Sequence, residues 1–457
     1  MGLVERLYES APVWLQEAAL SVYGLRLRLL RYGRGHAREL ERLRRTQWLD
    51  HDALVALQQD SWNQIRQAAE ATPLYQALWA GVRAPTELER LAELPVLCKD
   101  TLRAAGRGAV NSRMASQRLL EIHTGGTTGS PLTVFCTRQA LRRNYAFFSR
   151  LQEWAGLGER PRTATFAGRP IVPITQQQPP YWRSNRPGNA LLFSSYHLSP
   201  QTIPDYAKQL ARYAPELIDS YPSSLEPIAR WLLVNQGIAI RPRAVVTSSE
   251  TLTTEVRGMI EAAFGCRVFD YYGAAEMAAF ISQCEMGTYH PNPEFGVVEV
   301  LCEGRTARPG ELGELVVTGF VNPTMPLIRF ATGDLAVPGE GPCACGRAFS
   351  VLQSIEGRRD DVLVTPEGRL VGRLDPIFKK VESIYETRVV QDAPDHVRVE
   401  VVPVGVLPAR DADGLRKELE IRLGPAMRID IVPVESIPRT QRGKFRSVVN
   451  LVARSSS

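Results

Sequence analysis

The pattern of hydrophobic and polar positions changes near residue 117. Before residue 95, hydrophobic residues recur every three or four positions among long polar side chains, which predicts helices, for example at 37–45 and 60–71. From residue 117, short apolar runs bounded by Gly, Pro or Ser alternate with amphipathic stretches. We expect strands at 119–124, 216–219, 244–248 and 267–271, and helices at 139–154, 224–235 and 253–264. Strands that alternate with helices predict a largely parallel sheet.

The pattern changes again in the second half of the chain. Strands are expected at 296–302 and 314–320, and a charged break follows at 356–361. Beyond the break we expect a hairpin through 365–368, strands at 397–402 and 429–434, and a helix at 413–423. The fold class is therefore α/β. We predict a large N-terminal domain with a helical start (1–357, helical over 1–95) and a small α+β C-terminal domain (358–457).

Composition narrows the class of protein. Hydrophobic residues make up 44% and charged residues 23% of the 457 residues, which is typical of a globular protein. Lys and Arg exceed Asp and Glu by 55 to 49, which suits small anionic ligands but is too small an excess for a nucleic-acid partner. Seven cysteines, an odd number, make a poor disulfide framework, and we expect a cytoplasmic protein.

The segment 11–30 is partly apolar. Glu17, Arg26 and Arg28 exclude a membrane-spanning helix, and the segment lacks the cleavage site of a signal peptide. An interfacial amphipathic helix and a helix packed on its own domain both fit. The packed helix is the favoured interpretation, so no membrane contact is expected.

Two segments have the composition of nucleotide-binding loops. The first, Thr124-Gly125-Gly126-Thr127-Thr128-Gly129, follows a predicted strand, and its backbone N–H and hydroxyl groups can donate to phosphate oxygens. The second, from Asp270 to Glu276, ends a strand at the edge of the sheet where ligands of open α/β sheets bind. There an aromatic ring can stack on a purine and a carboxylate can hold Mg²⁺. A surface turn and a solvated helix start are the alternatives.

Two later segments are weaker signals. Asp334, in Thr332-Gly333-Asp334, suits the hydroxyls of a ribose, although such a turn is common. Lys444, in Gly443-Lys444, can reach an anionic transition state, although it also fits a solvated loop.

The order of these segments is more specific than any one of them. From Thr124 to Lys444 they resemble the acyl-AMP-forming superfamily, and within it the phenylacetate–coenzyme A ligase branch and its capsular-polysaccharide-associated relatives, which share a start like Ala11–Gln16. The resemblance implies a small mobile C-terminal lid domain. It implies ATP-dependent activation of a carboxylic acid as an acyl-adenylate, with Mg²⁺ and then transfer to coenzyme A. An amine acceptor, giving an amide, and a non-catalytic nucleotide-binding relative remain alternatives.

The resemblance also assigns roles to residues. It implies that the loop 124–129 orients the ATP phosphates, that Tyr272 lies near adenine beside Tyr271 and Gly273, and that Glu276 binds Mg²⁺. Ser249 and Glu250 line the nucleotide pocket, Asp334 and Arg358 approach the ribose, Asp360 is the hinge, and Lys444 contacts the carboxylate and α-phosphate. Gly125 and Ala275 depart from the family pattern, which has Ser and Thr there, and each removes a hydroxyl.

Three further groups have candidate chemistry. Cys284, His290, Cys343 and Cys345 form a set suited to structural Zn²⁺, with unligated thiols as the alternative; a similar cluster in the resembled branch favours zinc. His197 and Arg169 are candidates for the acid pocket, and a structural role fits either equally well. The expected partners are a small carboxylic acid and a thiol or amine acceptor, and a homodimer is compatible with the sequence.

Overall fold

The computed structural model describes residues 3–452, apart from 124–131, 169, 236, 359–362, 367–369, 372–374, 379–380, 382 and 441–444.

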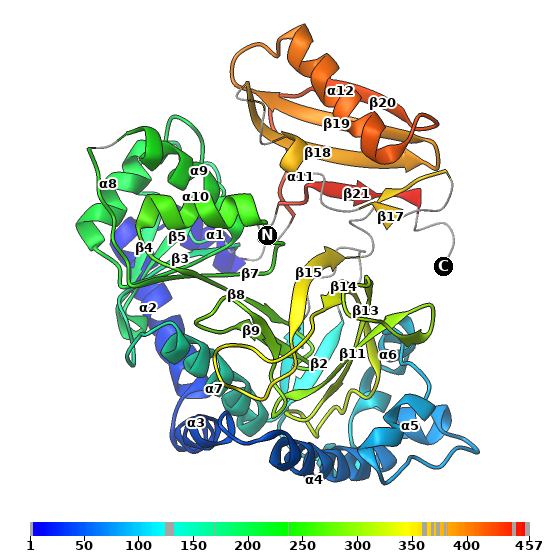
Figure 1. Ribbon diagram of the computed structural model, residues 1–457. Helices are drawn as coiled ribbons and strands as arrows, with labels where there is room; N and C mark the ends of the chain where they lie inside the picture. The colour runs from blue at the N-terminus through cyan, green and yellow to red at the C-terminus, as the bar shows by residue number, and fades with distance from the viewer. Residues whose placement is uncertain are drawn as a thin grey trace.

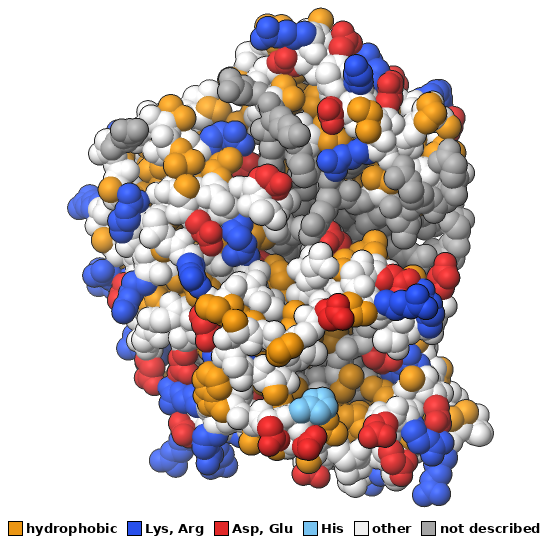
Figure 2. Space-filling view, viewed as in Figure 1, with side chains coloured by type: hydrophobic (Ala, Val, Ile, Leu, Met, Phe, Trp, Pro, Cys, Tyr) orange, Lys and Arg blue, Asp and Glu red, His pale blue; other side chains and the backbone are white. Residues whose placement is uncertain are grey.

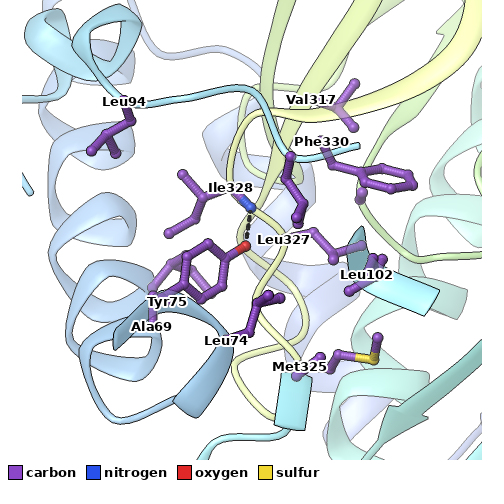
Figure 3. Packing of buried hydrophobic residues seen from close by; sticks show 14 of the residues in the cluster. Ala69, Leu74, Tyr75, Leu94, Leu102, Val317, Met325, Leu327, Ile328 and Phe330 are labelled. Carbon is purple, nitrogen blue, oxygen red and sulfur yellow. Dashed lines mark hydrogen bonds between the residues drawn. The ribbon is translucent and has the colours of Figure 1, made fainter. Parts of the chain in front are cut away.

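The chain begins with helices, as the spacing of apolar residues predicts. They are α1 (Leu3–Ser10), α2 (Val13–Arg31), α3 (Arg34–Thr46), α4 (His51–Glu70), α5 (Pro73–Leu78) and α6 (Lys99–Ala105), with short 3₁₀ turns at Leu88–Glu93, Gly106–Ala109 and Ser112–Met114. Asp50 caps α4 by accepting a hydrogen bond from Ala53 N. Figure 3 shows how α4 and α5 pack on the segment 325–330, where the hydroxyl of Tyr75 accepts a hydrogen bond from Ile328 N at 2.9 Å. This core fixes the helical segment to the large domain.

One mixed sheet of thirteen strands forms the centre of the large domain (Figure 1). Its order is β12-β11-β13-β14-β15-β10-β9-β8-β7-β6-β3-β5-β4. The strands are β3 (Thr163–Ala167), β4 (Trp182–Asn185), β5 (Ala190–Ser194), β6 (Leu217–Ser220), β7 (Ala244–Ser248), β8 (Val268–Gly273), β9 (Phe280–Gln283), β10 (Tyr289–Pro291), β11 (Gly296–Cys302), β12 (Arg305–Thr306), β13 (Gly313–Gly319), β14 (Phe330–Pro338) and β15 (Leu352–Arg358). A separate hairpin joins β1 (Leu120–His123) and β2 (Thr133–Cys136).

The sheet has a parallel and an antiparallel part. β5, β3, β6, β7 and β8 are parallel neighbours. Helical crossovers, as expected, lead from β5 to β6, from β6 to β7 and from β7 to β8, whereas the chain passes from β3 to β5 through β4. From β8 onward every pair within this sheet is antiparallel. The expected largely parallel sheet is therefore limited to these five strands.

Helices cover both faces of the parallel part. On one face lie α8 (Ile203–Tyr213), α9 (Pro222–Val234) and α10 (Thr254–Phe264), whose buried residues pack on Ile218, Val245 and Val268. On the other face, α3 and α7 (Arg138–Trp154) pack on Leu217, Val246 and Phe269. With both faces covered, a ligand reaches this sheet at the ends of its strands.

The small C-terminal domain has its own sheet, drawn in orange and red at the top of Figure 1. Its strand order is β20-β19-β18-β21, formed by β18 (Ile384–Ala393), β19 (His396–Pro403), β20 (Arg428–Pro433) and β21 (Val448–Asn450). Leu415, Leu419 and Leu423 of α12 (Ala409–Leu423) pack on the buried valines of β19. The expected hairpin is present as the antiparallel pair β16 (Leu363–Val364) and β17 (Leu370–Val371), and a short helix α11 (Asp375–Phe378) follows.

Among the described residues, no helix combines the length and the apolar character needed to cross a bilayer.

Candidate active site at the carboxyl ends of β7 and β8

A cavity of about 200 Å³ opens where β7 and β8 end. Its walls come from β1, α7 and the segments that follow the two strands, so residues far apart in the chain meet there. The lining combines aromatic rings with small polar groups: Tyr145, Phe148, Tyr271, Phe280, Asn144, Ser248 and Ser249. An apolar pocket with a few polar groups is typical of a small-molecule site.

The aromatic wall is held by ring contacts. Tyr271 stacks on Phe280 with ring centroids 5.5 Å apart, and the edge of Phe148 meets Tyr271 at 5.1 Å. Burial raises the pKa of Tyr271 well above its ordinary value, so its hydroxyl stays protonated. The wall is thus rigid and uncharged on this side.

Tyr272 lies next to Tyr271 on β8, so its side chain points to the opposite face of the strand. Its hydroxyl donates to Asp334 Oδ2 at 2.6 Å, and burial together with the charge of Asp334 raises the pKa of Tyr272. Asp334 on β14 is the register partner of Arg358 on β15. The structure therefore brings Tyr272, Asp334 and the backbone of Arg358 together, whereas the side chain of Arg358 lies outside what is described.

Glu276 lies in the loop after β8 and is buried. Lys99 Nζ, at the start of α6, lies 3.6 Å from Glu276 Oε1. Sequence reasoning missed Lys99, because a single lysine before a short helix carries no signal.

Two residues at the cavity have a strained backbone. Ser249 and Met277 adopt left-handed conformations, with φ of 70° and 58°, which are uncommon for residues other than glycine. Such strain concentrates at functional sites, where the surrounding structure maintains it.

Glu250 connects the two domains. Its carboxylate accepts hydrogen bonds from the N–H and hydroxyl of Ser223, each at 3.0 Å, and from Phe445 N at 3.0 Å. Burial raises the pKa of Glu250. Phe445 directly follows Lys444, so this contact brings the C-terminal loop to the end of β7.

Several predicted residues lie outside the described part of the chain: Thr124, Gly125, Gly126, Thr127, Thr128, Gly129, Arg169, Asp360 and Lys444. Ile122, on the strand β1 that precedes residues 124–129 in the sequence, lines the cavity. His197 is described and is not among the lining residues. It bonds to Ser194 Oγ at 2.7 Å and to the Pro173 carbonyl at 3.2 Å, and it stacks on Tyr181.

Asp219, on β6, is a second residue that the sequence did not single out. Its Cα pairs with that of Val246, two residues before Ser248. No described residue donates a hydrogen bond to its carboxylate, and burial raises its pKa to about 6. The available signal was a carboxylate at the end of the apolar run Leu217-Ile218.

The four predicted metal ligands come together at a separate place, the turn between β9 and β10 and the loop after β14. The ligand atoms of Cys284, His290, Cys343 and Cys345 all lie within 4.8 Å of one another. The Cys284 and Cys343 sulfurs are 3.7 Å apart, and Cys345 Sγ lies 3.5 Å from His290 Nε2. Tetrahedral Zn²⁺ at its usual bond lengths would place such atoms about 3.6–3.8 Å apart.

His290 is also oriented for metal binding. Its Nδ1 lies 3.0 Å from the Ser350 carbonyl, so an Nδ1–H donor leaves Nε2 as the free electron pair. The residues present therefore fit a closed structural zinc site.

Comparisons with known proteins agree with this geometry. The CapK C-terminal domain family matches residues 363–451. The chain is 28% identical to Protein CapK of Staphylococcus aureus over 98% of its own length and 99% of that protein. It is 24% identical to a phenylacetate–coenzyme A ligase of Thermus thermophilus, over 52% of this chain and 61% of the ligase. This homology to CapK and to phenylacetate–coenzyme A ligases supports the expected resemblance to the adenylate-forming superfamily and its phenylacetate–coenzyme A ligase branch.

Solved structures share the fold of this chain. A 2-hydroxyisobutyryl-CoA ligase in the postadenylation state, in complex with 2-HIB-AMP, superposes with a TM-score of 0.66. The alignment covers 88% of this chain and 90% of that one, at 20% sequence identity. This superfamily fold confirms the expected mixed α/β architecture with a large sheet and a small C-terminal domain.

Proposed function

We propose that the protein is an AMP-forming ligase that activates a small carboxylic acid with ATP and transfers the acyl group to coenzyme A. The observation that carries the proposal is the cavity at the carboxyl ends of β7 and β8, flanked by the Tyr272–Asp334 pair and by Glu276. The related phenylacetate–coenzyme A ligases support the reaction type.

The polar groups around the cavity have distinct roles in this proposal. Asp334, held by the Tyr272 hydroxyl at 2.6 Å, accepts hydrogen bonds from the ribose hydroxyls of ATP. Glu276 would hold Mg²⁺, which neutralises phosphate charge; its buried carboxylate is a hard oxygen ligand of the kind Mg²⁺ prefers. The loop 124–129 orients the phosphates, and Arg358 supports the ribose.

The chemical step joins two anions. The acid's carboxylate oxygen attacks the α-phosphorus, an O–P bond forms, and pyrophosphate leaves with the electrons of the broken bond. Lys444 stabilises the negative charge that accumulates there, and the Phe445–Glu250 hydrogen bond positions its loop. The aromatic wall around Tyr271 and Phe148 binds the organic part of the acid.

The proposal is tested by pyrophosphate release with ATP and Mg²⁺ over a panel of aryl, alkyl and amino acids, with coenzyme A or hydroxylamine as acceptor. We expect acid-dependent release that falls by about 10²-fold or more in Lys444→Ala and Glu276→Gln. Lys417→Ala, which removes an exposed lysine of α12, is the matched control and should retain full activity.

The acceptors separate the alternatives. Consumption of coenzyme A supports the thioester ligase, whereas transfer confined to amines would replace it with an amide ligase. ATP binding without pyrophosphate release for any acid would favour a non-catalytic relative.

We further propose that Cys284, His290, Cys343 and Cys345 bind one structural Zn²⁺. All four positions of a tetrahedron are filled by protein, so the ion has no open position for catalysis.

A further inference from the structure

We propose that the exposed face of α2 is a docking surface for an anionic phospholipid membrane, so that the enzyme works at a membrane surface. The proposal goes beyond the ligase function and does not depend on it.

The outward face of α2 is apolar along its length. Trp14, Val22, Leu25 and Leu29 expose 68%, 72%, 46% and 64% of their surface. With Ala18 they follow a spacing of three and four residues, so they form one stripe of about 22 Å. We call these five residues the α2 stripe. An exposed apolar stripe of this length is unusual on a protein surface that contacts only water.

Two polar side chains of α2, Gln16 and Glu17, are turned toward the protein. Gln16 Oε1 accepts from the buried Arg183 at 2.7 Å, and Glu17 Oε1 accepts from Ser184 N at 2.9 Å. At Gly24 the helix comes so close to β4 that an added methyl group would collide with Asn185. These contacts fix the rotation of α2, so the stripe cannot turn inward and stays at the surface.

Arginines flank the stripe. Arg26, Arg34 and Arg38 are exposed on α2 and α3, and Arg160 and Arg186 are exposed on the neighbouring loops. Arg28 and Arg160 both donate to the Pro187 carbonyl, at 3.4 and 3.3 Å, which brings two guanidinium groups together. Within the described part of the chain, none of these six arginines forms an ion pair with a carboxylate. At the lower left of Figure 2, over α3, further basic side chains lie among acidic ones, and there Arg42 and Arg44 pair with Glu39 and Glu41.

The arginines around the α2 stripe favour a phospholipid membrane over a second copy of the chain as the partner. A second copy of the chain would bring arginines against arginines, because the only carboxylate of α2, Glu17, faces β4. Phosphate headgroups complement the arginines, while acyl chains take up a convex stripe that begins with a tryptophan. α2 packs on its own domain, as the sequence favoured, and the proposal adds a membrane contact that the sequence analysis did not expect.

The test is co-sedimentation of the full chain with vesicles of phosphatidylcholine alone and of phosphatidylcholine mixed with phosphatidylglycerol. We expect binding to the anionic vesicles that weakens with salt. Leu25→Glu with Leu29→Glu should lower this binding by about tenfold or more, and so should Arg26→Gln with Arg38→Gln. Val406→Glu with Ile421→Glu, which changes exposed apolar residues of the C-terminal domain, is the matched control and should bind like the unchanged protein.

Every substituted side chain is exposed, so we expect all variants to unfold at the same temperature. Equal unfolding temperatures would show that the fold is intact. Absence of vesicle binding, or binding that survives the Leu25→Glu and Leu29→Glu pair, would overturn the proposal. A dimer in solution that this pair dissociates would overturn it in favour of a second copy, and loss of ligase activity in solution would show that α2 serves the active site instead.

Discussion

The Cys/His cluster and the cavity at the ends of β7 and β8 are both assembled from distant segments, yet their polar groups are satisfied to different degrees. At the cluster, His290 has a carbonyl partner, and nearby Arg347 bonds to both carboxylate oxygens of Glu285 at 2.9 Å. Beside the cavity, Glu276 has Lys99 at 3.6 Å, and Asp219 has no hydrogen-bond donor among the described residues. Polar groups that already have partners stabilise the fold, whereas polar groups held without them are available to a ligand.

The largest effect on stability is expected at the cluster. Removing zinc with a chelator, or replacing Cys345 by Ala, leaves the two loops without the metal that links them. We expect the unfolding temperature to fall by roughly 10 °C, on the scale of about 5 kcal/mol for a chain of this size. Metal analysis should find one zinc per chain before treatment. A purified protein that contains no metal and unfolds at the same temperature with and without chelator would refute the zinc proposal.

The next effect concerns the ion pair beside the cluster. Arg150 donates to Glu294 at 2.6 and 3.0 Å in a buried site, and its guanidinium lies over the rings of Phe147 and Trp154. Arg150→Met leaves Glu294 buried and unpaired, so the free energy of unfolding should fall by about 3–5 kcal/mol. Urea denaturation measures the change. Arg305→Met removes an exposed pair with Glu311 and should change the free energy of unfolding far less, because solvent screens that pair; equal losses would contradict this difference.

At the nucleotide site we expect a substitution to affect activity more than stability, because Asp334 is proposed to bind ATP. Asp334→Ala should raise the KM for ATP by about tenfold, because a charged hydrogen bond to the ribose is lost. The unfolding temperature should change little. Steady-state kinetics at saturating acid measures the first quantity. Tyr272→Phe keeps the carboxylate and should have a smaller effect. A large loss of stability with unchanged KM would assign Asp334 to the fold.

The smallest effect is a gain of stability at Asp219. Its pKa is raised to about 6 in the folded protein from an ordinary value of 3.8, so ionisation at higher pH opposes folding. Asp219→Asn should therefore stabilise the protein by about 1–2 kcal/mol above pH 6, allowing for partial solvent access. The gain should vanish below about pH 4, where the carboxyl is protonated in both the folded and the unfolded chain. Urea denaturation at pH 8 and pH 4 checks this, and a gain of equal size at both values would exclude ionisation as the cause.

Sequence periodicity located three of the five parallel strands, β6, β7 and β8, and the helices between them. The strand predicted at 244–248 coincides with β7, and the helix predicted at 139–154 begins one residue late. β3, β5 and β18 were missed, and the order of the thirteen strands was beyond reach, because strand pairing depends on tertiary contacts that periodicity does not record.

The candidate site likewise contains residues that the sequence identified and residues that only the structure reveals. Tyr272 and Asp334 were assigned to one nucleotide site through the family resemblance, and the structure joins them with one hydrogen bond. Lys99 and Asp219 lacked any local pattern; each gains its meaning only when α6 or β6 is placed beside the strands that end at the cavity. A role that arises from neighbours distant in sequence cannot be found from local residue types alone.

The Glu17–Ser184 hydrogen bond helps to cover an edge of the large sheet and so bears on the tendency of this protein to aggregate. β4 is the last strand of the large sheet, and Ser184 N–H is one of its outward-facing donors. An uncovered edge strand is a template on which strands of other molecules can add, and α2 lies across this one. A chain shortened to begin after Arg31 would therefore tend toward edge-to-edge aggregation, whatever its affinity for lipid.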